Sequence, residues 1–373
     1  MAKAVYVGVG SKARKMKKAY IGIGGKARKV KKMYIGVGGK ARLCYSAELE
    51  RYGMAAALST TRYDMRAATV GKYALFAGGF SPNYFYAEDV SSSVDAYNTS
   101  LTKSTPTELS CKRCGHAAAS VGGYALFAGG ASSHNFLGYG NIMSSVDAYD
   151  ASLTRSAAHI IGATAAIGGA AVGNYALFAG GTVYGQINED NVTSDVLAYD
   201  PSLTFTTAPQ LSVARANVKG ASVGNYALFA GGRAGSFCTT VDAYNASLTR
   251  TTATALSSEE NRTAAATVGN HAIFVGNTAS ADIYDASLTK TSAAILSTAR
   301  TGLAATTVGD YAIFSGGGVA DFCDASLTRS SIGTSMTGYD MGAATIGDYA
   351  LFAGGYSDEK SVTAYDSVEV YTA

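Results

Sequence analysis

The chain has 373 residues with 44 Gly, 4 Pro, 25 Tyr and no Trp, and charged residues make up 15%, against the roughly 25% usual for soluble domains. A chain so weakly charged and 47% hydrophobic can bury a core, which excludes intrinsic disorder, and scarce Pro without a triplet period excludes collagen. The net charge of +3 hides an uneven distribution, because residues 1–43 hold 13 Lys and Arg and no acids, whereas the other 330 residues carry 17 basic and 27 acidic side chains.

Two features of the sequence bear on where the chain is made. No apolar signal segment follows the first residues, so we expect no secretory signal peptide. The five cysteines, an odd number, indicate free thiols in a reducing cytoplasm and not a disulfide framework.

The stretch 156–188 has no charged residue, but glycines interrupt it and charged repeats align with it, so we interpret it as buried strands and expect no membrane insertion.

Residues 1–43 contain a basic repeat with a period of 14 residues: Tyr6–Arg14, Tyr20–Arg28 and Tyr34–Arg42. Each copy alternates β-branched or aromatic residues with Gly, reaches a Gly-Gly or Gly-Ser turn and ends in a basic segment, which is typical of a short hairpin. An isolated hairpin is only marginally stable, so we expect the copies to contact each other or other subunits. The residues that we assign to docking and oligomerisation are Tyr6, Arg14, Tyr20, Arg28, Tyr34 and Arg42.

Residues 44–373 contain a second, longer repeat. The segment Val-Gly-x-Tyr-Ala-Leu-Phe-Ala-Gly-Gly and its variants occur seven times, with spacings of 51, 51, 51, 45, 40 and 38 residues. The first Gly of each copy is Gly71, Gly122, Gly173, Gly224, Gly269, Gly309 or Gly347. A Val-Asp-Ala-Tyr strand, a Ser-Leu-Thr turn and a Leu-Ser-x-x-Arg connector follow in most copies. Four short strands per period of 40–50 residues predict an all-β fold, a seven-bladed β-propeller.

The two ends of this repeat array complement each other. The seventh copy stops after its third strand, at residues 367–371, whereas residues 48–58 precede the first copy and match a fourth strand. We therefore predict that residues 48–58 form the outer strand of the last blade, which removes the open edge between the first and last repeats. The predicted organisation is a basic β-repeat arm over residues 1–43 and a propeller over residues 44–373.

The di-glycine after an apolar strand, the downstream Tyr and the period of 40–50 residues resemble kelch repeats over residues 48–373. Arg62, Arg113, Arg215 and Arg300 keep one recurrent position, and Leu stands near the place where the kelch family carries Trp. The combination of basic arm repeats with Ala/Gly/Tyr-rich blades is also similar to predicted prophage proteins of Gram-positive gut bacteria, which are thought to belong to phage tails. That resemblance implies a virion component made in the host cytoplasm.

Candidate catalytic groups form no recognisable constellation in the sequence. Cys111 and Cys114 make a CxxC pair without a second ligand pair, so we interpret them, and Cys323, as small buried residues. The four His residues stand at unrelated repeat positions, and we expect packing roles for them. A copper site needs convergent His and Tyr ligands, and a glycosidase needs two positioned carboxylates. We therefore expect no enzyme activity, no cofactor and no metal site.

Acidic residues recur in most blades. Those inside the third strand are Asp95, Asp147, Asp242 and Asp282, and those at its exit are Asp150, Asp200, Asp285 and Asp324. We interpret both sets as turn residues that accept hydrogen bonds from backbone N–H groups two or three positions further on. The acidic segments 88–89 and 189–191 lack the loop pattern of known calcium sites.

The loops between the second and third strands differ in length, from about 14 residues in the first three blades to three or four in the fifth and sixth. The long loops are rich in aromatic and amide side chains, which on a rigid scaffold suit a glycan or protein ligand. The alternative is that the aromatic rings pack the loops onto their own scaffold. The residues that we assign to ligand binding are Tyr84, Phe85, Tyr86, His134, Asn135, Phe136, Tyr139, Tyr184, Gln186 and Asn188, and the shorter fourth loop adds Arg233 and Phe237.

These features predict a non-enzymatic, tail-associated virion protein for receptor binding or host adhesion. We expect the loops to bind a host-surface glycan or protein, and the arm to dock to other virion proteins and assemble a homo-oligomer, with a trimer favoured. The alternative is an intracellular scaffold whose arm binds nucleic acid or an acidic partner. Nucleic acid is the less favoured partner, since the arm has an even period and no groove-reading helix. A carbohydrate-active enzyme is the least favoured class.

Overall fold

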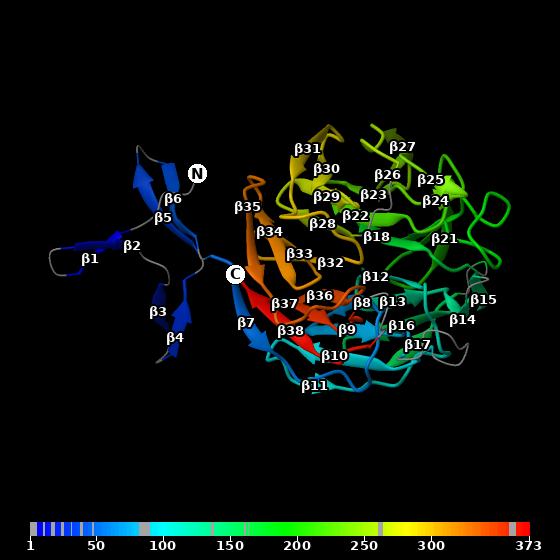
Figure 1. Ribbon diagram of the computed structural model, residues 1–373, viewed down its shortest axis with the longest axis horizontal. Helices are drawn as coiled ribbons and strands as arrows, with labels where there is room; N and C mark the ends of the chain where they lie inside the picture. Colours follow the sequence, from blue (N-terminus) through cyan, green and yellow to red (C-terminus); the bar gives the residue numbers. More distant parts are fainter. Residues whose placement is uncertain are drawn as a thin grey trace.

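The computed structural model describes residues 6–9, 12–15, 19–23, 26–30, 32–37, 40–46, 48–81, 90–135, 138–159, 162, 164–259, 264–357 and 363–373. Within these residues, seven four-stranded antiparallel sheets follow one another. The innermost strand of each sheet contacts the innermost strands of both neighbouring sheets, so the sheets close into a ring. The fold is a seven-bladed β-propeller, as the sequence predicts. Figure 1 shows the last sheet, in red, beside the first, in light blue.

The strands of blades 1 to 4, from the channel outward in each blade, follow the chain. They are β8 (Arg66–Val70), β9 (Tyr73–Ala77), β10 (Val94–Asn98) and β11 (Lys103–Ser104); β12 (Ala117–Val121), β13 (Tyr124–Ala128), β16 (Val146–Asp150) and β17 (Arg155–Ala157); β18 (Gly168–Val172), β19 (Tyr175–Ala179), β20 (Val196–Tyr199) and β21 (Phe205–Ala208); and β22 (Lys219–Val223), β23 (Tyr226–Ala230), β26 (Val241–Asn245) and β27 (Arg250–Ala253).

Blades 5 and 6 keep this order, and blade 7 takes its outer strand from the other end of the chain. The strands are β28 (Ala264–Val268), β29 (His271–Val275), β30 (Ser280–Asp285) and β31 (Lys290–Ala294); β32 (Ala304–Val308), β33 (Tyr311–Gly316), β34 (Val319–Asp324) and β35 (Arg329–Gly333); and β36 (Gly342–Ile346), β37 (Tyr349–Ala353), β38 (Val368–Thr372) and β7 (Glu50–Met54). The pairing of β7 with β38 closes the ring within the segment 48–58, where the sequence predicts it.

The hydrophobic core is divided into layers between neighbouring blades, because the second strand of each blade is apolar on both faces. In blade 1, Ala74 and Phe76 pack against blade 7, whereas Leu75 and Ala77 pack against blade 2. The turns between first and second strands also lie close to the neighbouring blade. A Cβ added to Gly224, whose φ is +53°, would lie 2.7 Å from the Cβ of Ala286 in the next blade. Small residues at the turns therefore set how closely the blades approach.

A buried Arg–Asp ion pair joins three elements within a blade. In blade 2, Arg113 Nη2 donates to Asp147 Oδ2 at 2.8 Å, and Arg113 Nη1 donates to the carbonyl oxygens of Gly129 at 3.0 Å and Ser145 at 2.9 Å. The backbone N–H and hydroxyl of Ser110 donate to the same carboxylate at 3.1 and 3.0 Å. The connector into the blade, the end of its second strand and the start of its third are thus tied together by one buried side chain.

The same ion pair recurs in three other blades, as Arg62–Asp95, Arg215–Asp242 and Arg300–Asp321. The sequence-based interpretation of Asp95, Asp147, Asp242 and Asp282 as turn residues is therefore wrong: they lie within strands, are at most 2% exposed, and accept charged donors from distant segments. The interpretation is confirmed for the exit residues Asp150, Asp200, Asp285 and Asp324, each of which accepts backbone N–H groups two and four positions on.

Blade 3 lacks this network, and all of its polar members are replaced together. Thr164 stands in the place of the Arg and Leu197 in that of the Asp, opposite Phe178. Phe205 replaces the basic residue of the fourth strand, and the sequence has Ile161 at the position of the Ser, which lies outside the described residues. The joint replacement fits the rule that removing one partner of a buried ion pair is strongly destabilising, whereas replacing the whole pair by apolar residues is often neutral.

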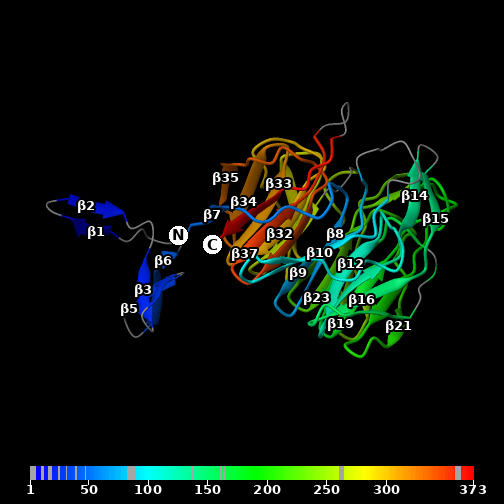
Figure 2. The ribbon, with the colours of Figure 1, turned by 90° about the horizontal axis from the view of Figure 1, so that it is seen from below.

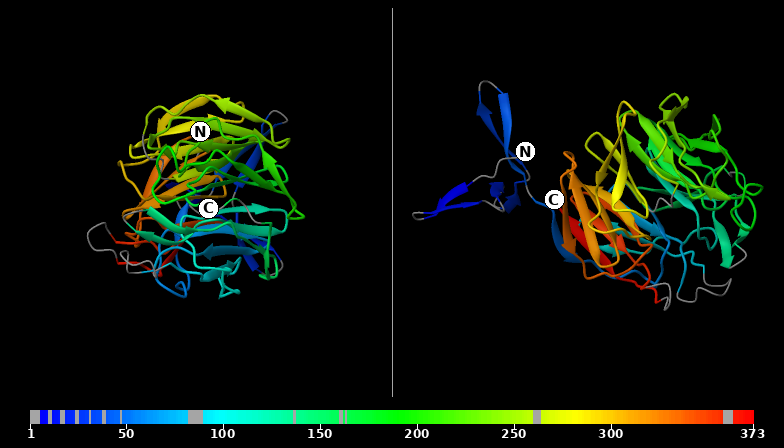
Figure 3. Two further views of the ribbon diagram at one scale, coloured as in Figure 1. Left: turned by 90° about the vertical axis from the view of Figure 1, so that its right-hand side faces the viewer. Right: turned by 45° about the horizontal axis from the view of Figure 1, so that its top comes forward.

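The described residues among the first 46 form three two-stranded hairpins that lie outside the ring (Figures 1 and 3). Their strands are β1 (Tyr6–Val9) with β2 (Lys12–Lys15), β3 (Tyr20–Ile23) with β4 (Lys26–Lys29), and β5 (Lys32–Val37) with β6 (Lys40–Ser46). The register is the same in each: Arg14 pairs with Val7, Arg28 with Ile21 and Arg42 with Ile35. Tyr6 and Tyr20 pair with Lys15 and Lys29, and Tyr34 with Leu43.

Breaking the ion pair of blade 4 should destabilise the ring more than removing the whole network. Arg215→Thr leaves Asp242 buried without its closest partner, so we expect a loss of about 3 kcal/mol in the free energy of unfolding. The fourfold variant Ser212→Ile, Arg215→Thr, Asp242→Leu and Arg250→Phe, which copies blade 3, should lose less.

Urea denaturation measures both values. Arg233→Thr removes an exposed Arg from the same blade and should leave the free energy of unfolding within about 0.5 kcal/mol of the wild type. A fourfold variant less stable than Arg215→Thr would contradict the explanation.

Candidate ligand-binding face

The loops between second and third strands leave the propeller on the same face as the connectors that lead into each blade. We call this the loop face. Loops and connectors share this face because each sheet is an antiparallel meander, in which the second strand ends at the edge where the first begins. The hairpin β14 (Ala131–Asn135) with β15 (Gly138–Ile142) rises from it in blade 2, as Figure 2 shows, and β24 (Arg233–Ala234) with β25 (Ser236–Phe237) in blade 4.

The loops of blades 2, 3 and 4 touch each other. The backbone N–H of Tyr139 donates to the carbonyl oxygen of Gly185 at 3.0 Å, which joins the loops of blades 2 and 3. A Cβ on Gly235 would lie 3.3 Å from the side chain of Glu189, so the loops of blades 3 and 4 also meet. By contrast, only residues 276–279 and 317–318 separate the second and third strands of blades 5 and 6. The loop face therefore has a raised side and a low side.

The structure divides the residues assigned to ligand binding. Tyr84, Phe85, Tyr86 and Phe136 lie outside the described residues, and His134 and Asn135 are placed only as positions in β14. Tyr139 is half-buried, and a Cβ on Gly115 would lie 2.6 Å from its ring, so this Tyr packs on its own scaffold. Tyr184 is 75% exposed. Gln186 and Asn188 are exposed, and Asn188 Oδ1 accepts the N–H groups of Asp190 and Asn191, both at 3.1 Å.

Large apolar side chains are exposed on the touching loops of blades 3 and 4. Val183 is 46% exposed beside Tyr184, and Phe237, on the touching loop of blade 4, is 38% exposed with the Arg233 guanidinium 5.9 Å from its ring centre. We call Val183, Tyr184, Arg233 and Phe237 the rim patch. The sequence analysis included Tyr184, Arg233 and Phe237 but passed over Val183, which shows no aromatic or amide signal.

Other aromatic residues on this face pack on each other. The rings of Tyr63 and Phe80 stack with their centres 5.2 Å apart, and Tyr356 of blade 7 lies 5.1 Å from Tyr63 and 5.9 Å from Tyr339. A small core of Val90, Cys114, Ala131 and Ala165 lies beneath the loops of the first three blades. The packing alternative therefore holds for Phe80 and Tyr139, whereas Tyr184 and Phe237 are exposed and their role in ligand binding stays a prediction.

The central channel opens in the middle of the loop face, where its mouth is built by one repeat position in a left-handed conformation. Asp64, Ala166, Asn217 and Asp340 have φ between +48° and +58°. Their backbone N–H groups donate to the carbonyl oxygen at the same position of a neighbouring blade, as in Asp64 to Asp340 at 2.8 Å and Asn217 to Ala166 at 2.7 Å. These hydrogen bonds between neighbouring blades make the channel mouth part of the rigid ring.

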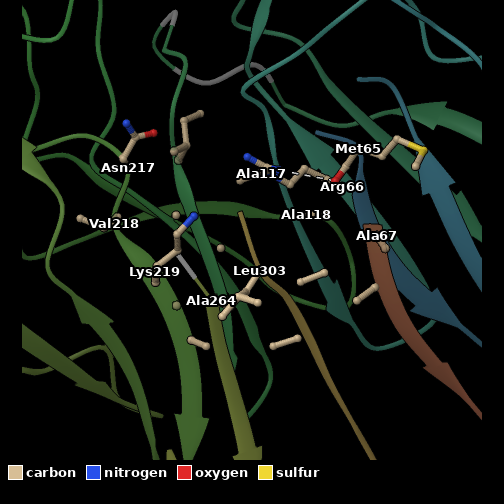
Figure 4. Close-up of a pocket in the computed structure, with 18 of the residues that line it drawn as sticks. Met65, Arg66, Ala67, Ala117, Ala118, Asn217, Val218, Lys219, Ala264 and Leu303 are labelled. Atoms are coloured by element: carbon tan, nitrogen blue, oxygen red, sulfur yellow. Dashed lines mark hydrogen bonds between the residues drawn. The ribbon is translucent and has the colours of Figure 1, made fainter. Parts of the chain in front are cut away.

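Inside the mouth is a cavity of about 250 Å³, lined mainly by Ala and Gly of the innermost strands. Two basic residues line it, Arg66 from blade 1 and Lys219 from blade 4, and Figure 4 shows them on different sides of the opening. Arg66 Nη1 donates to Asp64 Oδ1 at 2.7 Å and its Nε donates to the carbonyl oxygen of His116 at 3.0 Å. Burial, and then the neighbouring Asp64 carboxylate, raise the pKa of Asp340 to about 6.

The cysteines follow the sequence-based interpretation only in part. Cys114 and Cys323 are fully buried, and burial raises the pKa of the Cys323 thiol to about 12, so both are packing residues. Cys111 is half-buried and belongs to the polar network of blade 2, with its Sγ 3.1 Å from Arg113 Nη2 and 3.4 Å from Ser145 Oγ. No cluster of three or more metal-ligating side chains occurs in the part of the chain that the structure describes.

Comparison with known proteins adds no family to this chain. No protein-family model matches it, and no curated protein sequence matches it. The resemblance to kelch repeats therefore stays a prediction from pattern. Among the described residues, no helix combines the length and apolar character needed to cross a membrane.

His116 should make the stability of the ring depend on pH. Its side chain is fully buried, and burial together with Arg113 and Arg66 holds its pKa well below 6.5. Below pH 6.5 the unfolded chain binds a proton that the folded chain rejects, so the free energy of unfolding falls as the pH falls. This one group accounts for up to about 2 kcal/mol between pH 6.5 and pH 5.

The variant His116→Leu removes that contribution. The free energy of unfolding of the variant should therefore rise relative to that of the wild type as the pH falls from 7.5 to 5. The difference is the right measure because Asp340, whose pKa is raised, titrates in the same range with the opposite sign and is present in both proteins. Urea denaturation at each pH gives it, and a difference independent of pH would contradict this role of His116.

Proposed function

We propose that this protein is a non-enzymatic binding protein of a phage virion, associated with the tail, whose loop face attaches to a host-surface glycan or protein. The observation that carries the binding role is the rim patch, where Tyr184 and Phe237 stand exposed on touching loops of adjacent blades. Isolated exposed apolar residues are ordinary, but a group of them beside Arg and amide side chains on a fixed scaffold is typical of a recognition surface. The virion assignment itself rests on the resemblance of the sequence pattern.

Two properties of the ring support attachment over catalysis. The acids that recur in the blades hold internal ion pairs and Ser hydrogen bonds, and those inside the third strands are at most 2% exposed. In blades 2 and 4 of the raised side, the loops begin at strands that these ion pairs tie down. A binding surface gains affinity when its residues are held before the ligand arrives, because less conformational entropy is lost on binding.

The basic hairpins favour one second candidate, an intracellular scaffold. Each hairpin has one strand of alternating basic residues, Lys12–Lys15, Lys26–Lys29 or the start of Lys40–Ser46, and no third strand among the described residues. Two-stranded hairpins are marginal alone, so a partner that adds a strand or supplies negative charge would stabilise all three in the same way. In the leading proposal that partner is another subunit or virion protein.

Replacing the rim patch should abolish attachment without affecting the ring. We expect the double variant Tyr184→Ser and Phe237→Ser to lose at least tenfold in affinity, since two aromatic anchors of an interface each contribute more than about 1 kcal/mol. Adsorption of labelled protein to Gram-positive gut bacteria, together with a glycan array, measures it. Tyr52→Ser removes an aromatic residue that is 57% exposed on β7, away from the loop face, and is the matched control. Unchanged adsorption of the double variant would refute the binding role of the rim patch.

Removing the arm should change the assembly state and leave the propeller folded. Light scattering with the ratio of absorbance at 260 and 280 nm, on the full chain and on residues 44–373, distinguishes the two candidates. A full-length oligomer free of nucleic acid that becomes a folded monomer without the arm agrees with the virion proposal. A full-length monomer that copurifies with nucleic acid agrees with the scaffold.

A further inference from the structure

The end of the blade 3 loop carries hydrogen-bond acceptors beside the exposed ring of Tyr184. Val183 N–H donates to the carbonyl oxygen of Asn191 at 2.8 Å, so residues 184–190, which we call the tip, begin and end side by side. Tyr184 and Asp190 are the first and last residues of the tip and stand opposite each other in this antiparallel register. Tyr184 is 75% exposed, which leaves its ring open to a stacking partner.

The two carboxylates of the tip are open to a ligand. Glu189 and Asp190 are exposed, and neither side chain makes an ion pair or a hydrogen bond with any residue that the structure describes. The backbone that carries them is fixed, because Asn188 Oδ1 accepts the N–H groups of Asp190 and Asn191, both at 3.1 Å. A carboxylate offers acceptor sites and no donor, so its natural partners are O–H and N–H groups.

The charge of the raised side disfavours an anionic ligand. The touching loops of blades 2, 3 and 4 are residues 129–145, 180–195 and 231–240. Their charged residues are Glu189, Asp190, Asp195 and Arg233, and the two loop residues outside the described part, Phe136 and Leu137, are uncharged. The single base is held by its own hairpin, since Arg233 Nε donates to the carbonyl oxygen of Gly235 at 2.7 Å. A phosphate-bearing wall polymer would therefore meet an excess of negative charge, which costs binding energy.

The small number of exposed anchors favours a glycan over a protein. Among the described residues of these three loops, the large apolar side chains that are exposed are Val183, Tyr184 and Phe237. A stable protein interface buries about 800 Å² on each partner around an apolar centre. A sugar unit needs less, because an aromatic ring packs against its C–H face while nearby acceptors bind its hydroxyl groups.

We propose that the rim patch and the tip bind an uncharged glycan, with a sugar ring stacked on Tyr184 and its hydroxyl groups donating to Asp190 and Glu189. The inference rests on the proposed attachment function and names the ligand class for it. The acids of the tip then have a purpose that the exposed rings alone do not give them: they bind hydroxyl groups and repel anionic polymers of the cell surface.

Adsorption of the labelled full chain to Gram-positive gut bacteria tests the proposal. The quantity measured is the rim-dependent adsorption, which is that of the wild type minus that of the double variant Tyr184→Ser and Phe237→Ser. The basic arm is the same in both proteins, so its own attraction to the cell surface cancels. Periodate, which cleaves the vicinal diols of sugars, should remove the rim-dependent adsorption when the cells are treated with it, and proteinase K should not. Raising NaCl from about 50 to about 500 mM should leave it within about twofold, because salt screens charge pairs and the ligand has no charge.

A variant of the tip gives a second test with a predicted direction. Asp190→Ala should weaken the rim-dependent adsorption about tenfold, since a hydrogen bond to a charged acceptor is lost. An anionic ligand would instead bind this variant more tightly. Asp195→Ala is the matched control, because it removes an exposed acid from the base of the same loop, where Asp195 Oδ1 accepts a hydrogen bond from Gln210 Nε2 at 3.2 Å.

The outcomes separate this inference from the attachment function. Loss of rim-dependent adsorption after proteinase K would identify a protein ligand, and loss in high salt or a gain with Asp190→Ala would identify a charged one. Each of these results, like survival after periodate, would overturn the uncharged glycan and leave the attachment function standing. Equal adsorption of wild type and double variant on untreated cells would overturn the attachment function, and this inference with it.

Discussion

The buried Arg–Asp ion pair is the interaction on which the rest of this structure depends. One guanidinium, as in Arg113 or Arg215, bonds the carbonyl oxygens where the second strand ends, and the carboxylate that it holds lies in the third strand. The same carboxylate takes the Ser of the incoming connector, so it fixes where the loop between these strands starts. Blade 3 lacks the whole network, whereas blade 5 keeps the buried carboxylate of Asp282, which Lys290 and Ser257 hold, so the acid is retained where other donors reach it.

Ring closure depends on small residues as much as on the ion pairs. Second strands contribute apolar side chains to the layers on both of their faces. A Cβ added to the turn residue Gly173, Gly224 or Gly269 would lie less than 3 Å from an Ala of the next blade. Hydroxyl groups of the innermost strands add bonds between blades, as in Ser120 to the Thr69 carbonyl oxygen at 2.7 Å. A rigid ring with a narrow mouth results, and the residues that differ between blades are presented on it at fixed positions.

The proposed function depends on residues that break the repeat. The loops of blades 2, 3 and 4 touch and expose Tyr184 and Phe237, whereas blades 5 and 6 have almost no loop. The channel mouth is equally uneven, with acids on blades 1 and 7 and Lys219 on blade 4. Both asymmetries lie on the loop face. The three hairpins lie outside the ring (Figure 1).

The sequence by itself determined the number of blades, the strand order and the closing strand near residues 48–58, because these depend on local apolar alternation and on spacing along the chain. It did not reveal the role of Asp95, whose partner Arg62 is 33 residues away and becomes a neighbour only after the blade folds. The sequence also did not distinguish the packed Tyr139 from the exposed Tyr184, since the burial of a loop ring depends on which neighbour lies beneath it. The channel mouth was hidden for the same reason: Arg66 and Lys219 begin the innermost strands of blades 1 and 4, and only the closed ring brings them to one cavity.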